Sequence, residues 1–425
     1  MRFVSLGLAA ALTAAACPLT VSAETVRASA DVSGKAGVGP GAPQTVVTAG
    51  SGTGETGSSG SNGSSETGDG TGTGSAGTQY DITDNNLDWG EIDALIHTYN
   101  ATVVKNRNEW ATDKRKSEDA QGVRDYLLDK ADEYDGLYEQ YQSTSAMTAA
   151  NYKSSADSMR LQAESSVTDS QVIQLQYDLI EKQTAETARA AFLGYYQSQY
   201  ELVYDTANRD YLERVYASTV NKQKLGMATE IDVLTAKENV DAAKAAILAA
   251  DTNIGSYRNT LIVMCGWKYD TTDAVIGALP ELDAAQVSSI DYEADKARAK
   301  AANYTLRMDE IKLANAKSGS YTTLVVEQNE NQLNDDTQSF GISFKAAYDS
   351  LVNAGTAYTN AVNDKAVADR NLNTAVNELA QGVISNIEYE GTKNAQAKAE
   401  YAERTAYIGL IEAKAAYDAA LSGNL

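Results

Sequence analysis

Side chains that commonly perform catalysis or bind metals are scarce in this sequence of 425 residues. His97 is the single histidine, and the two cysteines are Cys17 and Cys265. Ser-His-Asp catalysis and zinc sites usually depend on histidine, often on several. We find no phosphate-binding glycine motif and no nucleophile–base pair that stands out. The sequence therefore predicts a protein that is not an enzyme and holds no metal or other cofactor.

Two further groups of reactive side chains have ordinary explanations. Cys265 ends the apolar run 261–265, which favours a buried apolar residue. Glu330, Asn334, Asp335 and Asp336 lie close together and could suggest calcium, but their spacing does not fit an EF-hand and the central glycine is missing. We therefore expect a solvated acidic loop there.

The charge balance disfavours nucleic acid as a partner. The chain has 35 basic and 58 acidic residues, which gives a net charge of -23. Such a surface repels phosphate backbones and anionic lipids. Acidity alone does not identify a partner.

The N-terminus predicts export. Arg2 precedes an apolar run over 3–16, and Val21-Ser22-Ala23 offers a small-x-small cleavage site, so residues 1–23 fit a signal peptide. The alternative is a lipoprotein signal that ends at Cys17. Residues 24–79 are dominated by Gly, Ser and Thr and predict a disordered linker.

From Tyr80 onward the chain is predicted to be mainly α-helical. Pro280 is the only proline after Pro43, and long proline-free stretches rich in Ala, Leu, Lys, Glu and Gln are typical of extended helices. Two apolar stripes recur at alternating steps of three and four, over 233–264 and 351–379. This spacing favours antiparallel coiled-coil helices, with a helix over 170–222 about 80 Å long.

An internal repeat divides the helical region. The segments 225–232 and 381–388 each place a glycine, a hydroxyl residue and an acidic residue at the same spacing, 156 residues apart. A glycine that ends one helix, followed by a hydroxyl N-cap with an acid three places on, predicts a tight turn between two helices. The six residues are Gly226, Thr229, Asp232, Gly382, Ser385 and Glu388.

A weaker match relates the starts of the two halves. Asn100 and Asn303 each precede a predicted helix, and their offset makes the first half about 47 residues longer before its turn. Pro280 is the expected boundary, with a first repeat over 80–279 and a second over 280–425.

With its two glycine turns and duplicated helices, the chain from about Asp81 to Leu425 resembles the TolC-like outer-membrane efflux family. The resemblance implies a homotrimer that forms a helical tunnel and binds a HlyD-like periplasmic adaptor, coupled to an ABC, RND or MFS transporter. It also implies that Gly226, Thr229, Asp232, Gly382, Ser385 and Glu388 contact the adaptor. Capping alone would explain the same residues.

The sequence departs from that family where each half should carry two transmembrane strands. In the first half, 165–170 is predicted to be a bare helix break. In the second half, 321–326 and 339–344 are predicted to be short strands joined by a loop over 329–337. The resemblance implies an outer-membrane location, and a wall-associated or extracellular one if such strands are missing. The rival function is a tethered structural or adhesive surface coiled coil.

Overall fold

The computed structural model describes residues 85–425, apart from 114–119, 270, 284–286, 288 and 320. The predicted signal peptide, Cys17 and the linker over 24–79 lie outside the described residues. The predicted fold class is confirmed. Most of the described residues are helical, and the described strands have only two residues each.

The first half of the described chain contains six helices after a short strand and a 3-10 turn. In order, its elements are β1 (Asn86–Leu87), η1 (Trp89–Glu91), α2 (Ile92–Tyr99), α3 (Ala101–Asp113), α4 (Ala120–Tyr141), α5 (Ala146–Ser165), α6 (Ser170–Lys224) and α7 (Glu230–Met264).

The second half repeats this plan without a counterpart of α4 and α5. Its elements are β2 (Val275–Ile276), α8 (Tyr292–Ala302), α9 (Tyr304–Ser318), α10 (Thr323–Ala380) and α11 (Asn386–Leu421). β1 and β2 pair in parallel, with Asn86 opposite Val275 and Leu87 opposite Ile276. This short pairing ties the start of the first half to the connection between the halves.

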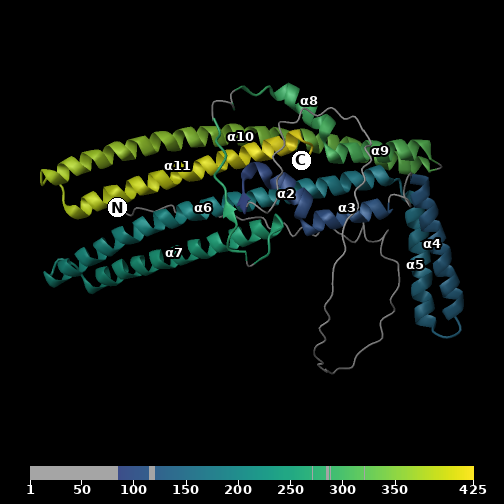
Figure 1. Cartoon of the computed structure of the whole chain (residues 1–425), viewed down its shortest axis with the longest axis horizontal. Coiled ribbons are helices and arrows are strands. Elements are labelled where there is room, and N and C mark those ends of the chain that lie inside the picture. Colours follow the sequence, from purple (N-terminus) through teal and green to yellow (C-terminus); the bar gives the residue numbers. More distant parts are fainter. Residues whose placement is uncertain (1–84, 114–119, 270, 284–286, 288, 320) are drawn as a thin grey trace, which may run out of the picture. The chain divides into compact units, whose positions relative to one another are not determined.

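Four long helices form the body of the fold (Figure 1). α6 packs along α7, α10 packs along α11, and α6 and α11 join the two hairpins. The predicted long helix is confirmed, because α6 has 55 residues and its counterpart α10 has 58. At ~1.5 Å per residue each is between 80 and 90 Å long.

The apolar stripes predicted from the sequence lie at the contacts within each hairpin. On α7, the buried members of the stripe are Ala236, Val240, Ala243, Ala250 and Leu261. On α10, Leu351 and Ala375 are buried in the same way. Alanines at these positions let the paired helices approach closely, as the spacing indicated.

Both strands predicted in the second half are wrong. Residues 323–326 and 339–344 lie within α10, and so does the predicted loop over 329–337 with its acidic residues. The β-branched and aromatic side chains favoured strands, but helical spacing decides the outcome here. Phe340 and Phe344 are four residues apart, so they share one helix face and are buried in the same cluster.

The extra length of the first half is a second helical hairpin. α4 and α5 pack against each other, and Arg160 on α5 pairs with Asp132 and Asp135 on α4. The predicted helix break over 165–170 is confirmed as the junction of α5 and α6, where Asp169 caps α6 by accepting from the Gln171 and Val172 amides at 2.9 Å. In the second half only four residues separate α9 from α10.

Candidate functional site

The turn between α6 and α7 has the predicted capping geometry. Gly226 has a φ of +75°, and the Met227 amide donates to the Lys222 carbonyl at 2.8 Å, which closes the end of α6. The Asp232 amide donates to Thr229 Oγ1 at 3.2 Å, and the Thr229 amide donates to Asp232 Oδ2 at 2.7 Å. This reciprocal pair is a capping box that starts α7.

The turn between α10 and α11 repeats this arrangement. Gly382 has a φ of +72°, and the Val383 amide donates to the Glu378 carbonyl at 2.8 Å. The Glu388 amide donates to Ser385 Oγ at 3.3 Å, and the Ser385 amide donates to Glu388 Oε2 at 2.8 Å. All six residues predicted from the sequence therefore sit at two equivalent turns.

The acids of the two capping boxes are held in their ionised form. Hydrogen bonds from the Thr229 backbone, and then from its hydroxyl, lower the pKa of Asp232. The backbone and hydroxyl of Ser385 lower the pKa of Glu388 in the same way. Each turn thus presents a fixed negative charge at the N-terminus of a helix, where the helix dipole also favours it.

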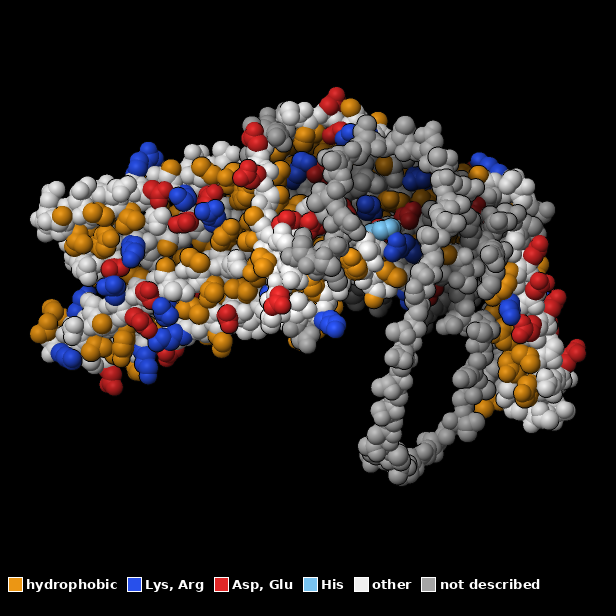
Figure 2. Space-filling model, in the orientation of Figure 1, with side chains coloured by type: hydrophobic (Ala, Val, Ile, Leu, Met, Phe, Trp, Pro, Cys, Tyr) orange, Lys and Arg blue, Asp and Glu red, His pale blue; other side chains and the backbone are white. Residues whose placement is uncertain are grey.

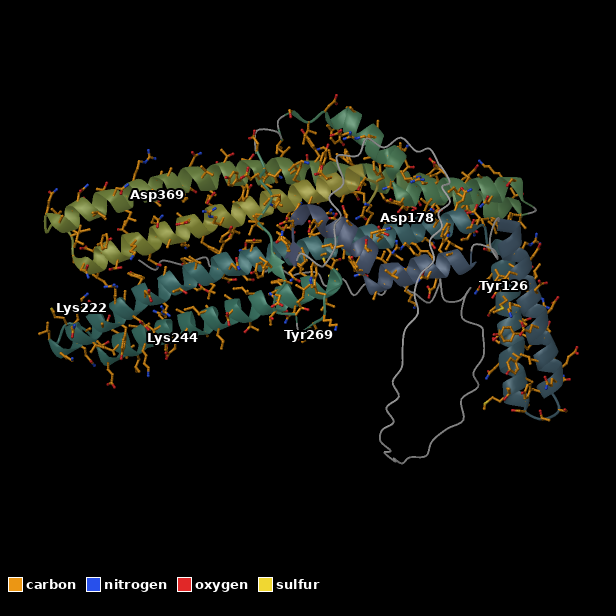
Figure 3. The ribbon with its side chains drawn as sticks, in the orientation of Figure 1. Tyr126, Asp178, Lys222, Lys244, Tyr269 and Asp369 are labelled. Carbon is orange, nitrogen blue, oxygen red and sulfur yellow. The ribbon has the colours of Figure 1, made fainter. Side chains whose placement is uncertain are left out.

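Large apolar side chains stand exposed around the same turns. Leu225 is 72% exposed, Met227 67% and Ile231 74% at the first turn, and Val383 is 67% exposed at the second. Figure 2 shows hydrophobic side chains gathered at this end of the long helices, and Figure 3 labels Lys222 beside the first turn. The capping hydrogen bonds do not require these side chains to be apolar.

The other end of each long hairpin is closed by a second pair of glycines. Gly266 follows α7 with a φ of +105°, and Gly423 follows α11 with a φ of +97°. A Cβ on Gly266 would lie 2.3 Å from Tyr99 Cβ, and one on Gly423 would lie 2.2 Å from the Ala302 carbonyl oxygen. Because these positions have no side chain, the end of α7 can contact the break between α2 and α3, and the end of α11 can contact the break between α8 and α9.

Those breaks are the asparagines matched in the sequence. Asn100 Oδ1 accepts from the Thr102 and Val103 amides, and Asn303 Oδ1 accepts from the Leu306 amide at 2.9 Å. The two asparagines have nearly the same backbone, with φ and ψ of -66° and 122° at Asn100 and -58° and 121° at Asn303. The halves therefore agree at their starts, their turns and their ends.

The edge helices α7 and α10 each carry a second stripe of small or uncharged side chains. On α7 the exposed members are Ala242, Ala245, Ala249, Thr252 and Ser256. On α10 the exposed members are Val352, Thr359, Val362, Ala366 and Val376, while Asp369 at the same spacing accepts a hydrogen bond from Gln396 of α11. We call these the outer stripes. Among the described residues, neither edge helix packs along a further long helix at its outer stripe.

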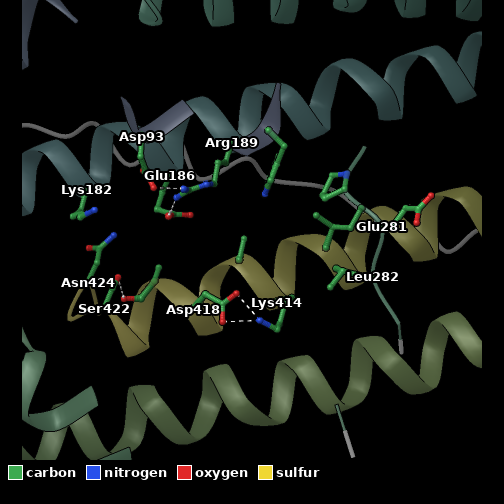
Figure 4. A pocket seen from close by; sticks show the side chains of 15 residues that line it. Asp93, Lys182, Glu186, Arg189, Glu281, Leu282, Lys414, Asp418, Ser422 and Asn424 are labelled. Atoms are coloured by element: carbon green, nitrogen blue, oxygen red, sulfur yellow. Dashed lines mark hydrogen bonds and ion pairs between the residues drawn. The ribbon is translucent and has the colours of Figure 1, made fainter. Parts of the chain in front are cut away.

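A cavity of about 330 Å³ lies between α6, α11 and residues 280–282 (Figure 4). Arg189 donates to Asp93 at 2.7 Å and pairs with Glu186, while Lys414 pairs with Asp418. Burial raises the pKa of Glu186, and Arg189 opposes that rise. On each wall of the cavity, the basic side chain therefore pairs with acidic side chains of the same wall.

The two residue types considered first for chemistry have structural contacts. His97 lies between two charged partners, with Nδ1 2.9 Å from Glu181 Oε1 and Nε2 2.7 Å from an Arg107 nitrogen. Cys265 is fully buried, as predicted, and burial raises the pKa of its thiol to about 12. In the described part of the chain, no three His, Cys, Asp or Glu side chains are grouped to hold a metal ion.

Sequence reasoning found the turn residues and missed three other features. It missed the closing glycines Gly266 and Gly423, although each directly follows an apolar stripe or a long helix, where a C-terminal glycine is common. It also missed the exposed apolar side chains at the turns and the outer stripes. No helix of the described residues combines the length and apolar character that crossing a membrane requires.

No protein-family model matches the chain, and no curated protein matches it. Among solved structures, the chain is similar to the outer-membrane channel OprN, with 15% identity and a TM-score of 0.41 over 62% of this chain and 72% of that chain. The Campylobacter jejuni CmeC outer membrane channel matches with 11% identity and a TM-score of 0.41, over 64% and 68% of the two chains. The Neisseria gonorrhoeae MtrE outer membrane channel matches with 12% identity and a TM-score of 0.42, over 79% and 89%.

Proposed function

We propose that this chain is a component of an export or efflux channel in the cell envelope, in which three copies close into an α-helical tunnel. The observation that carries the proposal is the pair of outer stripes on the edge helices. A helix with apolar or small side chains on two faces, each at steps of three and four, is typical of a helix with neighbours on both sides. Among the described residues of one copy, the long helix that packs along α7 is α6 and the long helix that packs along α10 is α11, while the shorter α9 also packs against α10.

The second part of the proposal concerns the turns. A HlyD-like periplasmic adaptor, coupled to an ABC, RND or MFS transporter, binds at Gly226, Thr229, Asp232, Gly382, Ser385 and Glu388. The exposed Met227 and Val383 support a protein partner there, because apolar side chains ringed by fixed charges are typical of interfaces. We place the protein in the outer membrane, or at the wall or outside the cell as the alternative, after removal of residues 1–23.

The rival is a structural or adhesive surface coiled coil, tethered by residues 24–79. The two proposals differ in the assembled state. Negative-stain images of the purified chain should show hollow trimers, and chemical cross-linking should stop at three copies. Solid rods of two copies would favour the rival.

The adaptor proposal is tested by placing a photo-cross-linking amino acid at Met227 and, separately, at Val383 in the native cell. We expect adducts that mass spectrometry identifies as a HlyD-like adaptor. The matched control is Leu161 on α5, which is 69% exposed but lies outside the turns. Adducts of equal yield at Leu161, or no adaptor adduct at either turn, would contradict the proposal.

Cross-linking is a clearer test than reversing the charges of the two capping acids. Reversing Asp232 and Glu388 would remove two capping boxes together with two charges, so lost export would have two explanations. Substitution of Met227 and Val383 by serine leaves both capping boxes in place. Export that survives both serine substitutions would show that these apolar side chains do not contribute to binding.

A further inference from the structure

Asp309 on α9 is a buried carboxyl group with one unsatisfied oxygen. Its residue is 4% exposed, and Oδ1 lies 3.1 Å from the Lys312 ammonium. Oδ2 is buried and has no hydrogen-bond partner among the described residues. An orphaned buried oxygen destabilises a fold by the desolvation that it suffers, so this one requires an explanation.

The group that faces Asp309 is another carboxyl, Asp336 on α10. α9 packs against α10, Lys317 of α9 pairs with Glu330 of α10 at 2.7 Å, and Asp336 lies close enough to Asp309 to raise its pKa. Gln332 donates to Asp336 Oδ2 at 2.8 Å. Two ionised carboxylates cannot bond to each other, because both are acceptors only. A single proton turns one of them into a donor, and Asp309 Oδ2 then gains the partner that it lacks.

The surroundings favour that proton. Burial, and then Asp336, raise the pKa of Asp309 to about 6, while Lys312 opposes the rise. On its other side α9 meets α6, which presents Val172 and Leu175 to Met308. The acids Asp178 and Glu181 of α6 act on Tyr304 instead. The charged groups that act on Asp309 most strongly are Asp336 and Lys312.

We propose that Asp309 and Asp336 share one proton, which joins α9 to α10 in a mildly acidic medium and is released near neutral pH. When it leaves, two negative charges face each other in a poorly hydrated contact and push α9 from α10. α9 also holds the junction of α5 and α6, because Asn315 Nδ2 donates to the Val167 carbonyl at 3.0 Å and to Asp169 Oδ2 at 2.9 Å. The proton therefore controls how tightly α9 packs against α10 and against the junction of α5 and α6.

A divalent cation is the other occupant that two carboxylates suggest. The Lys312 ammonium already neutralises Oδ1 and repels a cation at that position. Calcium also takes six to eight oxygen ligands, far more than this pair supplies. The shared proton needs no further ligand.

The test compares thermal unfolding of the full chain with that of Asp309→Asn and Asp336→Asn, from about pH 4 to about pH 8. Each amide can donate permanently to the remaining carboxylate, so each variant mimics the protonated pair. The folded-state pKa of Asp309 is raised above its unfolded value, so the pair stabilises the wild type fully below about pH 4 and loses that contribution as pH rises through about 6.

We expect the folded-to-unfolded ratio of the wild type to fall, relative to both variants, on the order of 100-fold across that window. The control is Asp349→Asn, a half-exposed residue of α10 that pairs with Lys345, and it should follow the wild type. Curves for both amide variants that stay parallel to the wild type would overturn the proposal. So would a wild-type melting temperature that about 1 mM calcium chloride raises at neutral pH while both variants do not respond, because the pair would then be a cation site.

Discussion

At the scale of single residues, the backbone of four glycines sets the ends of the long helices. Gly226, Gly266, Gly382 and Gly423 all have positive φ, which an L-residue adopts only with strain. Gly226 and Gly382 have open space where a Cβ would point. A side chain at either turn is therefore opposed by backbone conformation alone and not by a clash.

This gives a clean prediction for Gly382→Ala. The change should destabilise the turn by about 1 kcal/mol, because alanine in the left-handed region is strained. Amide hydrogen exchange of residues near the turn measures it, with faster exchange expected there and little change elsewhere. The matched control is Gly341→Ala, which lies within α10 with no atom near its Cβ position. It should stabilise α10 by about 0.5–1 kcal/mol, and equal effects of the two changes would contradict the argument.

The residues of the turns were predictable because capping is local. Thr229 and Asp232 are three positions apart in the sequence, and their hydrogen bonds need no other element. The pairing of Asp309 with Asp336 was not predictable, because it depends on how α9 lies against α10. Sequence reasoning had even placed Asp336 in a solvated loop, where no partner from α9 would meet it.

At the scale of elements, helix lengths followed from the absence of proline and from the spacing of apolar residues. The strand predictions failed because residues 321–326 and 339–344 have strand-like side chains but lack a turn between them. With no glycine or proline pair to reverse the chain, the helix continues through both segments. Packing then stabilises the helix, with Phe344 against Tyr417 and Tyr292.

The long helices should fold without the hairpin of α4 and α5. Its contacts are mostly internal, including Leu127 against Ala163 and the ion pairs of Arg160. We expect that replacing residues 114–165 with a short Gly/Ser connection removes the 22 helical residues of α4 and the 20 of α5, and leaves the melting temperature of the remaining helices within a few degrees.

Far-UV circular dichroism measures both the lost helix signal and the melting temperature. The junction contacts of α6 stay in this variant, because Tyr321 OH donates to the Ser166 carbonyl at 2.6 Å and Asn315 binds Val167 and Asp169. A collapse of the whole helical signal would show that the hairpin stabilises the long helices after all.

At the scale of the whole molecule, the outer stripes are the basis of the proposed contacts between copies. The buried stripes alone account for the two hairpins, and the outer stripes have no such explanation within one chain. The buried stripes were found in the sequence because their members are mostly apolar and recur at steps of three and four. The outer stripes were missed, because exposed small or hydroxyl residues such as Ala245, Thr252 and Ser256 resemble an ordinary solvated helix face in the sequence.

Placing a charge on an outer stripe should therefore weaken assembly. Ala249→Glu on α7 and Val362→Glu on α10 would each force a carboxylate into a helix–helix contact, which is strongly unfavourable without a partner. We expect sedimentation velocity to show a shift from trimer to monomer for both variants.

The control for these variants is Ala150→Glu, at an exposed alanine of α5 outside the outer stripes. It should sediment as the wild type does. Far-UV circular dichroism should be unchanged in all three variants, so that lost assembly is not confused with unfolding. If both stripe variants assembled normally, the proposed arrangement of the copies would be wrong.

Among the described residues, the largest difference between the two halves is that α4 and α5 stand in the first, whereas only four residues separate α9 from α10 in the second. Each copy therefore has two nearly identical glycine turns but only one hairpin of the α4–α5 kind among the described residues. A ligand that recognises the glycine turns would find two nearly equivalent sites on each copy, whatever number of copies assembles. A ligand that recognises the hairpin of α4 and α5 would find one site on each copy. The stoichiometry of a complex would thus reveal which of these surfaces the bound molecule recognises, without any view of the contact itself.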